Sequence, residues 1–297
     1  MFKLALSGTN PKFYEKYDLK GICGFIKSIG LDALEVVDAN LEPLKGTERV
    51  MGVWSNLDIA GAKKILDEMG VMTPVVQFRY AFNKEISADA ERHVKEFKAS
   101  IDAAVQLGAK KVLHYLCFEV FKTQDMQLIH AYCDEPLRYA QSKGIYLVME
   151  NEFENAANQT PEKMLAIMEE FNNPYFLTNY DAPNYEMAGC EGYPYAYNML
   201  KDYIGYVHLK NVCVYKPKFC DSRYEIGHTI SGGMYEGLPI AFVSAFEGSV
   251  NIPALLKRLK DDNYDFYLTF EPHAELELAM EDIKKDMVVL KKLGYAK

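Results

Sequence analysis

Short apolar runs recur along the chain, and each is followed by a segment that can hold a helix. Most of the runs are continuously apolar rather than alternating, which is typical of strands buried on both faces, as in a parallel sheet. The pattern predicts strands at residues 3–7, 33–37, 74–78, 111–115, 145–150, 176–180, 206–210 and 266–271.

The segments between these runs carry helix-boundary residues as well as helical spacing. Residues 88–107 follow Ser87 and stop at Gly108, with apolar residues recurring at helical spacing between them. Thr160, followed by a proline, likewise predicts a helix start, as an N-cap before the first helical residue. The predicted helices are residues 13–29, 58–69, 88–107, 123–142, 160–171, 195–202, 253–261 and 276–293.

This eightfold alternation is compatible with a closed (β/α)8 barrel or with a long doubly wound sheet. A dinucleotide-binding sheet carries a glycine-rich loop after its first strand, and residues 7–10, Ser-Gly-Thr-Asn, do not match GxGxxG. The 297 residues are 49% hydrophobic, which is ample for a core, and barrels of roughly 250 residues form one domain. We therefore expect a single α/β domain over residues 1–297, a (β/α)8 TIM barrel.

One connection departs from the alternation. Residues 211–249, after the seventh predicted strand, are 39 residues rich in Gly, Tyr, Lys and Pro without helical periodicity. Loops of this length are uncommon unless they are functional, and a loop at this position of a barrel lies beside the active-site mouth. We expect a long insertion that covers the substrate; the alternatives are a surface excursion or a contact in a homo-oligomer.

The charge balance and the cysteines limit the classes of partner and compartment. The chain has a net charge of −9 and no basic stripe, which disfavours a nucleic-acid partner. No stretch approaches the roughly 18 apolar residues of a membrane-spanning helix, and the apolar run at the N-terminus is too short for a secretion signal. Six cysteines without a CxxC pair are expected to be free thiols, and we predict a cytoplasmic protein.

Four polar residues stand at the ends of predicted strands late in the chain. In a parallel barrel the carboxyl ends of the strands converge on one mouth, and a carboxylate near the core is costly unless it is paired or bound to a cation. Two Glu, one Asp and one His would together make a compact, oxygen-rich site for a divalent metal. The four residues are Glu150, Asp181, His208 and Glu271.

Each of these residues also has a structural explanation. Either glutamate alone could form a salt bridge with Lys210 or Arg79 at the end of the barrel. Asp181 could instead cap a turn, and His208 could be a satisfied core histidine. Four such residues on four successive strands favour the metal site.

Five further polar residues lie at or near predicted strand ends and are candidates for substrate binding. Arg79, for example, could grip a phosphate or carboxylate group. For each of the five, a structural hydrogen bond at the barrel mouth is an equal alternative. The candidates are Glu35, Gln77, Arg79, His114 and Lys210.

Short motifs around the four strand ends carry a family resemblance. Residues 148–151 read Val-Met-Glu-Asn, residues 180–184 Tyr-Asp-Ala-Pro-Asn, and residues 208–211 His-Leu-Lys-Asn. In this order and spacing they resemble the l-x-E-N, x-D-x-x-N and H-l-K-D motifs of the xylose isomerase-like superfamily of sugar phosphate isomerases and epimerases. Residues 31–36, 246–259 and 264–271 resemble further motifs of the family, so the similarity runs over essentially the whole chain.

The resemblance implies a metal-dependent sugar isomerase or epimerase with one divalent ion, Mn, Mg, Co or Zn, bound by Glu150, Asp181, His208 and Glu271. Three features depart from the family pattern. No His follows Asp181 at the usual distance. Asn211 stands where the family has Asp, and the 39-residue connection after the seventh strand is long for the family.

The chemistry of such an enzyme fits the residues. Isomerising or epimerising a ketose requires removal of a proton beside a carbonyl, and a metal polarises that carbonyl and stabilises the enediolate. Glu150 and Glu271, from strands separated around the barrel, could exchange the proton on opposite sides of a small sugar. The sugar could be phosphorylated or not.

Three alternatives remain. A metal-dependent sugar or inosose dehydratase would use the same proton removal, followed by loss of hydroxide. An endonuclease of the abasic-site type would need more metal-binding His and Asp residues and a basic face, which are not apparent in the sequence. A non-catalytic sugar-binding barrel would be marked by the loss of metal ligands, and all four are present.

Overall fold

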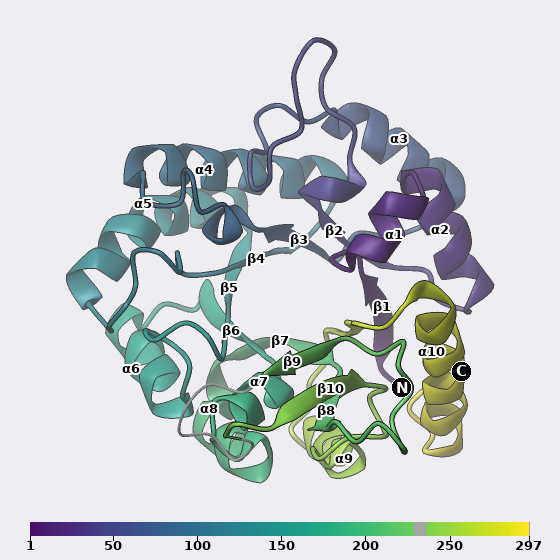
Figure 1. Cartoon of the computed structure of the whole chain (residues 1–297). Helices are drawn as coiled ribbons and strands as arrows, with labels where there is room; N and C mark the ends of the chain where they lie inside the picture. Colours follow the sequence, from purple (N-terminus) through teal and green to yellow (C-terminus); the bar gives the residue numbers. More distant parts are fainter. Residues whose placement is uncertain (229–235, 297) are drawn as a thin grey trace.

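Eight parallel strands close into a barrel in the computed structural model, which describes residues 1–228 and 236–296 (Figure 1). The strands follow one another around the barrel in chain order, and the last, β11, pairs with both β7 and β1. This confirms the predicted (β/α)8 barrel, and each predicted strand overlaps an observed one. The strands are β1 (Lys3–Ser7), β2 (Leu34–Val37), β3 (Val75–Phe78), β4 (Lys111–His114), β5 (Tyr146–Glu150), β6 (Phe176–Tyr180), β7 (Ile204–Leu209) and β11 (Tyr267–Phe270).

Helices form a ring around the barrel (Figure 1). Capping residues set their ends: Asp89 accepts a hydrogen bond from the backbone of Arg92 at the start of α4, and Gly108 ends that helix in the left-handed conformation that favours glycine. The α-helices in the described part of the chain are α1 (Pro11–Lys16), α2 (Leu19–Ser28), α3 (Ile59–Met69), α4 (Ala90–Leu107), α5 (Met126–Lys143), α6 (Pro161–Phe171), α7 (Ala182–Met187), α8 (Tyr197–Leu200), α9 (Ile252–Asp261) and α10 (Leu276–Lys292).

Three helical regions differ from the prediction. Residues 13–29, expected as one helix, form α1 and α2, because Tyr17 is extended and Asp18 starts a new helix by capping it. Residues 195–202 are helical but not one α-helix: α8 follows a π-helix, Gly192–Ala196, and precedes a 3-10 helix, Lys201–Tyr203. The short helix α7 was not predicted; it begins directly after Asp181, whose side chain caps it.

Alternate residues of the strands point into the barrel. Leu113, Val148 and Tyr206 belong to one buried cluster in the interior. Side chains on a strand alternate between its two faces. Glu150 therefore shares the inward face of Val148, and His208 shares the inward face of Tyr206, each two residues closer to the carboxyl end of its strand.

A small antiparallel sheet occupies the connection between β7 and α9. Its strands are β8 (Asn211–Val214), β9 (Ile226–His228) and β10 (Pro239–Val243), in the order β8–β10–β9. The expected loop over residues 211–249 therefore contains a three-stranded sheet beside the barrel mouth (Figure 1). Residues 229–235 of this segment lie outside the described residues.

Asn211 ties the two ends of this segment together. Its Nδ2 donates hydrogen bonds to the carbonyl oxygens of Ala245 and Val250, at 2.9 and 3.0 Å, and its Oδ1 accepts from the backbone of Val250 at 3.1 Å. A Cβ at Gly248 would lie 2.2 Å from the Asn211 side chain, so only glycine fits there. The residue that departs from the family motif thus anchors the base of the sheet.

Two expectations from composition can be compared with the structure. No helix in the described part of the chain is both long enough and apolar enough to cross a membrane. All six cysteines are free thiols, as expected.

Candidate metal and active site

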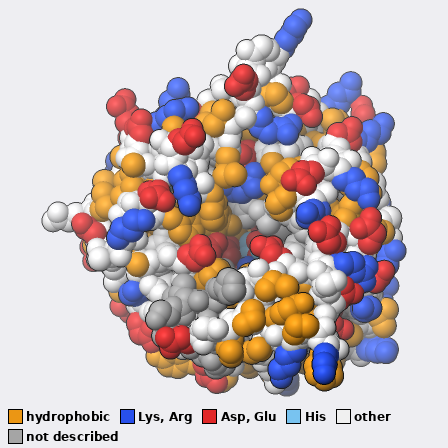
Figure 2. Space-filling view, in the orientation of Figure 1, with side chains coloured by type: hydrophobic (Ala, Val, Ile, Leu, Met, Phe, Trp, Pro, Cys, Tyr) orange, Lys and Arg blue, Asp and Glu red, His pale blue; other side chains and the backbone are white. Residues whose placement is uncertain are grey.

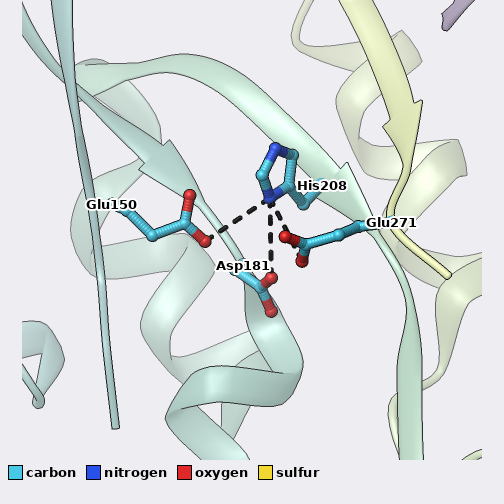
Figure 3. Close-up of side chains that lie close together, drawn as sticks. All are labelled: Glu150, Asp181, His208 and Glu271. Atoms are coloured by element: carbon cyan, nitrogen blue, oxygen red, sulfur yellow. Dashed lines mark ion pairs between the residues drawn. The ribbon is translucent and has the colours of Figure 1, made fainter. Parts of the chain in front are cut away.

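Four strand ends bring Glu150, Asp181, His208 and Glu271 to one point of the mouth. Glu150 ends β5, Asp181 follows β6, His208 lies near the end of β7, and Glu271 follows β11. All four are buried, and one potential ligand atom from each lies within 4.8 Å of those from the others. The three carboxylates converge on one ring nitrogen of His208 (Figure 3). The sequence-based expectation that these residues meet therefore agrees with their placement.

The nitrogen at the centre of this group is Nδ1 of His208. It lies 3.4 Å from Glu150 Oε1, 3.4 Å from Glu271 Oε2 and 3.9 Å from Asp181 Oδ2. These separations exceed or barely reach hydrogen-bonding range. Ligands about 2.0–2.4 Å from one ion lie at most about 4–5 Å from one another. The spacing thus suits a shared cation better than direct contacts.

Glu35 on β2 holds the other side of the imidazole. Its Oε2 lies 3.0 Å from His208 Nε2, and its Oε1 accepts from Ser7 Oγ at 2.5 Å and from Gln77 Nε2 at 3.3 Å. An ionised carboxylate that accepts from Nε2–H leaves the lone pair on Nδ1, the nitrogen that faces Glu150, Asp181 and Glu271. Outer partners of this kind fix the tautomer of metal-binding histidines.

Asparagine side chains fix the first two carboxylates. Asn179 donates to Glu150 Oε2, and Asn184 lies 3.5 Å from Glu150 Oε1. The backbone N–H of Asn184 donates to Asp181 Oδ1 at 3.1 Å. Asn151 exchanges two hydrogen bonds with the backbone of Asp181. Asp181 therefore caps α7 with one oxygen and presents the other to the site, so its structural and metal-binding explanations are compatible.

Lys210 lies between two of the carboxylates. Its Nζ is 2.9 Å from Asp181 Oδ2 and 2.7 Å from Glu271 Oε2. Burial by itself would raise the pKa of Glu271, but the positive charges of Lys210 and His208 hold it well below its ordinary value. Glu271 is therefore ionised at neutral pH.

The pKa values of Glu150 and His208 are instead both raised. Burial raises the pKa of Glu150 to about 7, and the charges of Asp181 and Glu271 add to the rise against the opposing effect of His208. Burial lowers the pKa of His208, but the surrounding carboxylates outweigh it, so that this pKa lies well above its ordinary value. Without a cation, the site retains protons near neutral pH that a metal ion would displace.

The residues present fit a divalent ion. His208 Nδ1 and Asp181 Oδ2 are buried and have no hydrogen-bond partner among the described residues, although Asp181 has the ion pair with Lys210. Unpaired buried polar atoms are costly. The inward-facing carboxylates of Glu35, Glu150, Asp181 and Glu271 also outnumber the two basic groups. A cation bound by the carboxylate oxygens and the imidazole would give the buried atoms a partner and balance the excess negative charge.

The predicted substrate-binding residues lie in different surroundings. Gln77 lies in the barrel interior, where its Nε2 donates to Tyr115 at 2.8 Å. Arg79 is buried just after β3 and pairs with Asp38 at 2.7 Å. His114 does not reach the mouth: its ring packs against Phe97 of α4, outside the barrel. It follows Leu113 on the opposite face of β4, which explains why a position at a strand end was not enough to aim it at the site.

Sequence reasoning overlooked several residues of the site. Asn151 and Asn184 appear in the family-like motifs and Asn179 directly precedes one of them, but no role was assigned to them. Glu152 was also missed; its pKa is raised well above the ordinary value by burial and by the charge of Glu150. The acid-rich run of residues 150–154 was the signal that could have identified it.

The mouth is a hollow near the centre of the face shown in Figure 2, with acidic side chains at its rim. Hydrophobic side chains gather on one side of it, over the sheet β8–β10–β9 (Figure 2). The sheet thus forms one wall of the approach to the site.

Comparison with known proteins gives one family. The family model Xylose isomerase-like TIM barrel matches residues 23–293. No curated protein matches the chain in sequence.

Several solved structures share the fold over nearly the whole length of both chains. The probable 3-DHS dehydratase AsbF of Bacillus anthracis is 16% identical, with 98% of this chain and 99% of that chain covered and a TM-score of 0.69. D-allulose 3-epimerase of Methylomonas sp., in complex with D-allulose, is 14% identical, with 98% and 96% covered and a TM-score of 0.67. A xylose isomerase-like TIM barrel protein of Mycobacterium smegmatis, in complex with magnesium, is 15% identical, with 99% and 98% covered and a TM-score of 0.70.

Proposed function

The chain belongs to the xylose isomerase-like TIM barrel family, and from this premise we propose that it is a metal-dependent isomerase or epimerase of a ketose or a related sugar. The observation that carries the proposal is the convergence of Glu150, Asp181, His208 and Glu271 within 4.8 Å of one another at the carboxyl end of the barrel. A barrel places its reactive groups at this end. The similarity to an epimerase of a ketose supports the substrate class.

We assign the four residues as the ligands of one divalent ion, Mn²⁺, Mg²⁺, Co²⁺ or Zn²⁺. The similarity to a structure in complex with magnesium supports a metal of this class. When bound, such an ion polarises a carbonyl oxygen and stabilises the negative charge that develops on it. The protein supplies the dry, fixed surroundings in which that stabilisation is large.

We assign the proton transfer to Glu150 and Glu271. They stand on β5 and directly after β11, with β6 and β7 between them, so their carboxylates approach the site from two sides. One removes the proton from the carbon beside the carbonyl, and the other delivers its own proton to the neighbouring carbon or to the opposite face; both then exchange protons with solvent to restore their starting forms. Asn179 holds Glu150, and Lys210 holds Glu271, in the required orientation.

We keep Glu35, Gln77, Arg79 and Lys210 as residues that bind or orient the substrate. Glu35 and Gln77 act through His208 and Tyr115, with which they share hydrogen bonds. Arg79 retains N–H groups beyond those that bind Asp38, and these suit a phosphate or carboxylate. His114 is left out of this set because its ring packs outside the barrel. A covering role for residues 211–249, its alternative as a contact in a homo-oligomer, and a cytoplasmic location all stay predictions.

A second candidate function is dehydration of a sugar or inosose. It begins with the same proton removal and differs only in that a hydroxide leaves. The similarity to the probable dehydratase of Bacillus anthracis is as high as that to the epimerase, which is why this reaction is kept.

One experiment tests the proposal. Metal-free protein is titrated with Mn²⁺ by calorimetry and then incubated with a panel of ketoses, inososes and their phosphates in D₂O. An isomerase or epimerase converts a member of the panel to an isomer that carries deuterium on carbon, whereas a dehydratase releases a product that has lost one water. Tight Mn²⁺ binding with sugar binding, but with no product and no deuterium incorporation, would instead identify a sugar-binding barrel.

A further inference from the structure

The sheet between β7 and α9 is joined to the loop that follows Glu271. The backbone N–H of Glu225 donates to the carbonyl oxygen of His273 at 3.2 Å, and that of Glu275 donates to Arg223 at 2.9 Å. Tyr224 and Ala274 form an antiparallel bridge between these two contacts. The residues that lead into β9 therefore lie along the chain immediately after a proposed metal ligand.

Two side chains of the sheet segment hold the imidazole of His273. Glu225 Oε2 lies 3.0 Å from Nδ1. The ring of Phe242, on β10, stacks on the imidazole with 4.5 Å between ring centroids and 24° between their planes. A hydrogen bond at one edge and a stacked ring on one face fix both the position and the rotation of the imidazole.

The other ring nitrogen of His273, Nε2, is buried and makes no hydrogen bond in the described part of the chain. Glu271 Oε2 is 3.6 Å away, which is beyond hydrogen-bonding distance. A buried ring nitrogen that lies 3.6 Å from a carboxylate but makes no hydrogen bond is costly unless something else binds it.

We propose that His273 contacts the substrate, with Nε2 bound to a hydroxyl or carbonyl oxygen of the sugar, and that Glu225 and Phe242 position it. The inference rests on the proposed function, because the sugar has to be held beside Glu271. A hydroxyl group both donates and accepts hydrogen bonds, so it satisfies Nε2 in either protonation state of the ring. A purely structural histidine would need no free nitrogen at this point.

This arrangement gives the sheet a defined part in substrate choice. His273 belongs to the barrel, but both residues that orient it belong to the segment between β7 and α9. Changes in that segment would therefore alter which sugar oxygen Nε2 reaches, without altering the four proposed metal ligands. A site built to hydrogen-bond a particular hydroxyl discriminates strongly against sugars that lack it there.

The test uses the full-length protein loaded with Mn²⁺ and three variants. His273→Phe keeps a ring against Phe242 but removes both nitrogens, and Glu225→Gln keeps the shape of the positioning residue. His130→Phe is the matched control. His130 Nδ1 lies 2.8 Å from Asp134 within the outer helix α5, and the His130 ring stacks on Phe171 of the outer helix α6 at 4.6 Å.

The experiment measures three things: the binding of Mn²⁺ alone, the binding of ketoses such as D-allulose and D-fructose to the loaded protein, and kcat and KM for any ketose that turns over. We expect His273→Phe to bind Mn²⁺ within about threefold of wild type and to raise the ketose Kd or KM roughly tenfold, as for a lost hydrogen bond. Glu225→Gln gives a smaller change in the same direction, and His130→Phe gives none.

Two results overturn the inference while the proposed function stands. One is a His273→Phe protein that binds and converts ketoses as wild type does. The other is a loss of Mn²⁺ affinity as large as the loss of ketose affinity, which would make His273 a support for Glu271 alone. If wild type binds neither Mn²⁺ nor any ketose, the proposed function itself fails, and the inference fails with it.

Discussion

His208 and Glu35 are joined across the barrel interior: His208 Nε2 lies 3.0 Å from Glu35 Oε2, although 173 positions separate the two residues in the sequence. Both side chains are fully buried. The contact leaves Nδ1 as the only imidazole nitrogen that can face Glu150, Asp181 and Glu271. Glu35 therefore determines which tautomer of His208 faces the proposed metal site.

The first prediction concerns this contact. The amide of a Glu35→Gln variant can donate to Nε2, which places the proton on Nδ1, the nitrogen that has to bind the metal. We expect the affinity for Mn²⁺ to fall roughly 10- to 100-fold, the usual effect of losing an outer partner of a metal-binding histidine. Calorimetric titration of the metal-free protein measures it.

Glu96 supplies the matched control for this variant. It is a buried glutamate on α4 that accepts hydrogen bonds from the backbone of Trp54 and Ser55, far from the four ligands. Glu96→Gln should lower the free energy of unfolding without changing the affinity of the folded protein for Mn²⁺. An unchanged affinity in Glu35→Gln would mean that His208 is oriented by something else.

The barrel and the four proposed ligands could be predicted from the sequence for one physical reason. Strands buried on both faces must be continuously apolar, so a polar residue at the end of such a run is conspicuous. The convergence of parallel strand ends then brings those residues together without any knowledge of side-chain direction. Glu150 and Glu271 are of this kind.

The direction of each side chain was harder to predict. A continuously apolar strand does not reveal which of its faces points inward. His114 therefore looked equivalent to Gln77 in the sequence, yet His114 packs against Phe97 outside the barrel and Gln77 reaches Tyr115 inside it. Which alternate residues of β4 face the barrel interior is set by how the barrel closes and not by local composition.

The sheet β8–β10–β9 was hidden for a different reason. Its strands are only three to five residues long, and their pairing joins residues far apart in the segment. Val212 lies opposite Phe242, for example. Short strands of this kind are defined by their partners more than by their own sequence.

Lys210 is expected to act as the internal counter-ion of the metal-free site. Its Nζ neutralises Asp181 and Glu271, at 2.9 and 2.7 Å. A Lys210→Met variant would remove the nearest positive charge from two buried carboxylates and leave them with the weaker contacts to His208, at 3.9 and 3.4 Å, so the metal-free protein should unfold at a lower temperature. The same change removes a positive charge beside the metal, so Mn²⁺ should bind more tightly and raise the unfolding temperature more than in wild type.

Scanning calorimetry with EDTA and with saturating Mn²⁺ checks both parts of this prediction. Lys163→Met is a suitable control, because Lys163 also donates hydrogen bonds from a partly buried position, to Ala156 and Gln159, but does so on α6. It should lower the unfolding temperature equally with and without Mn²⁺. Equal shifts in Lys210→Met would contradict the counter-ion role.

A third prediction concerns the pH dependence of stability at Asp286 on α10. Burial raises the pKa of this carboxyl to about 7, and the charges of Asp282 and Glu247 add to the rise. In an unfolded chain the pKa is about 3.9. The stability that comes from the protonated form is therefore present in full below about pH 4 and is lost as the pH rises through 7.

Asp286→Asn should remove this loss, because the amide stays neutral and can still bond Ser244 and the backbone of Ala245, the present partners of the carboxyl. We expect the difference in the free energy of unfolding, variant minus wild type, to increase by on the order of 2 kcal/mol from pH 5 to pH 8. Urea unfolding in EDTA measures it, with Glu281→Gln, exposed on the same helix, as the control for a lost charge. A difference that is the same at both pH values would show that Asp286 ionises as it does in the unfolded chain.

The last prediction separates proton transfer from metal binding. Glu150→Gln and Glu271→Gln each keep the shape of the side chain and one coordinating oxygen, but neither amide accepts a proton from carbon. Mn²⁺ should still bind, more weakly, while turnover of the true substrate falls by roughly 10²- to 10⁴-fold, as for a lost general acid or base. Transfer of deuterium from D₂O to the carbon of the substrate should be lost in parallel, and it is followed by NMR at saturating Mn²⁺ so that weaker binding does not contribute. Glu96→Gln provides the control, since it is the same substitution at a buried glutamate that accepts hydrogen bonds from the backbone of Trp54 and Ser55; it should change turnover far less than either of the other two glutamine variants. Near-normal turnover in Glu150→Gln or Glu271→Gln would assign the proton to another group, and Lys210, which lies within 3 Å of both Asp181 and Glu271, would be the next residue to replace.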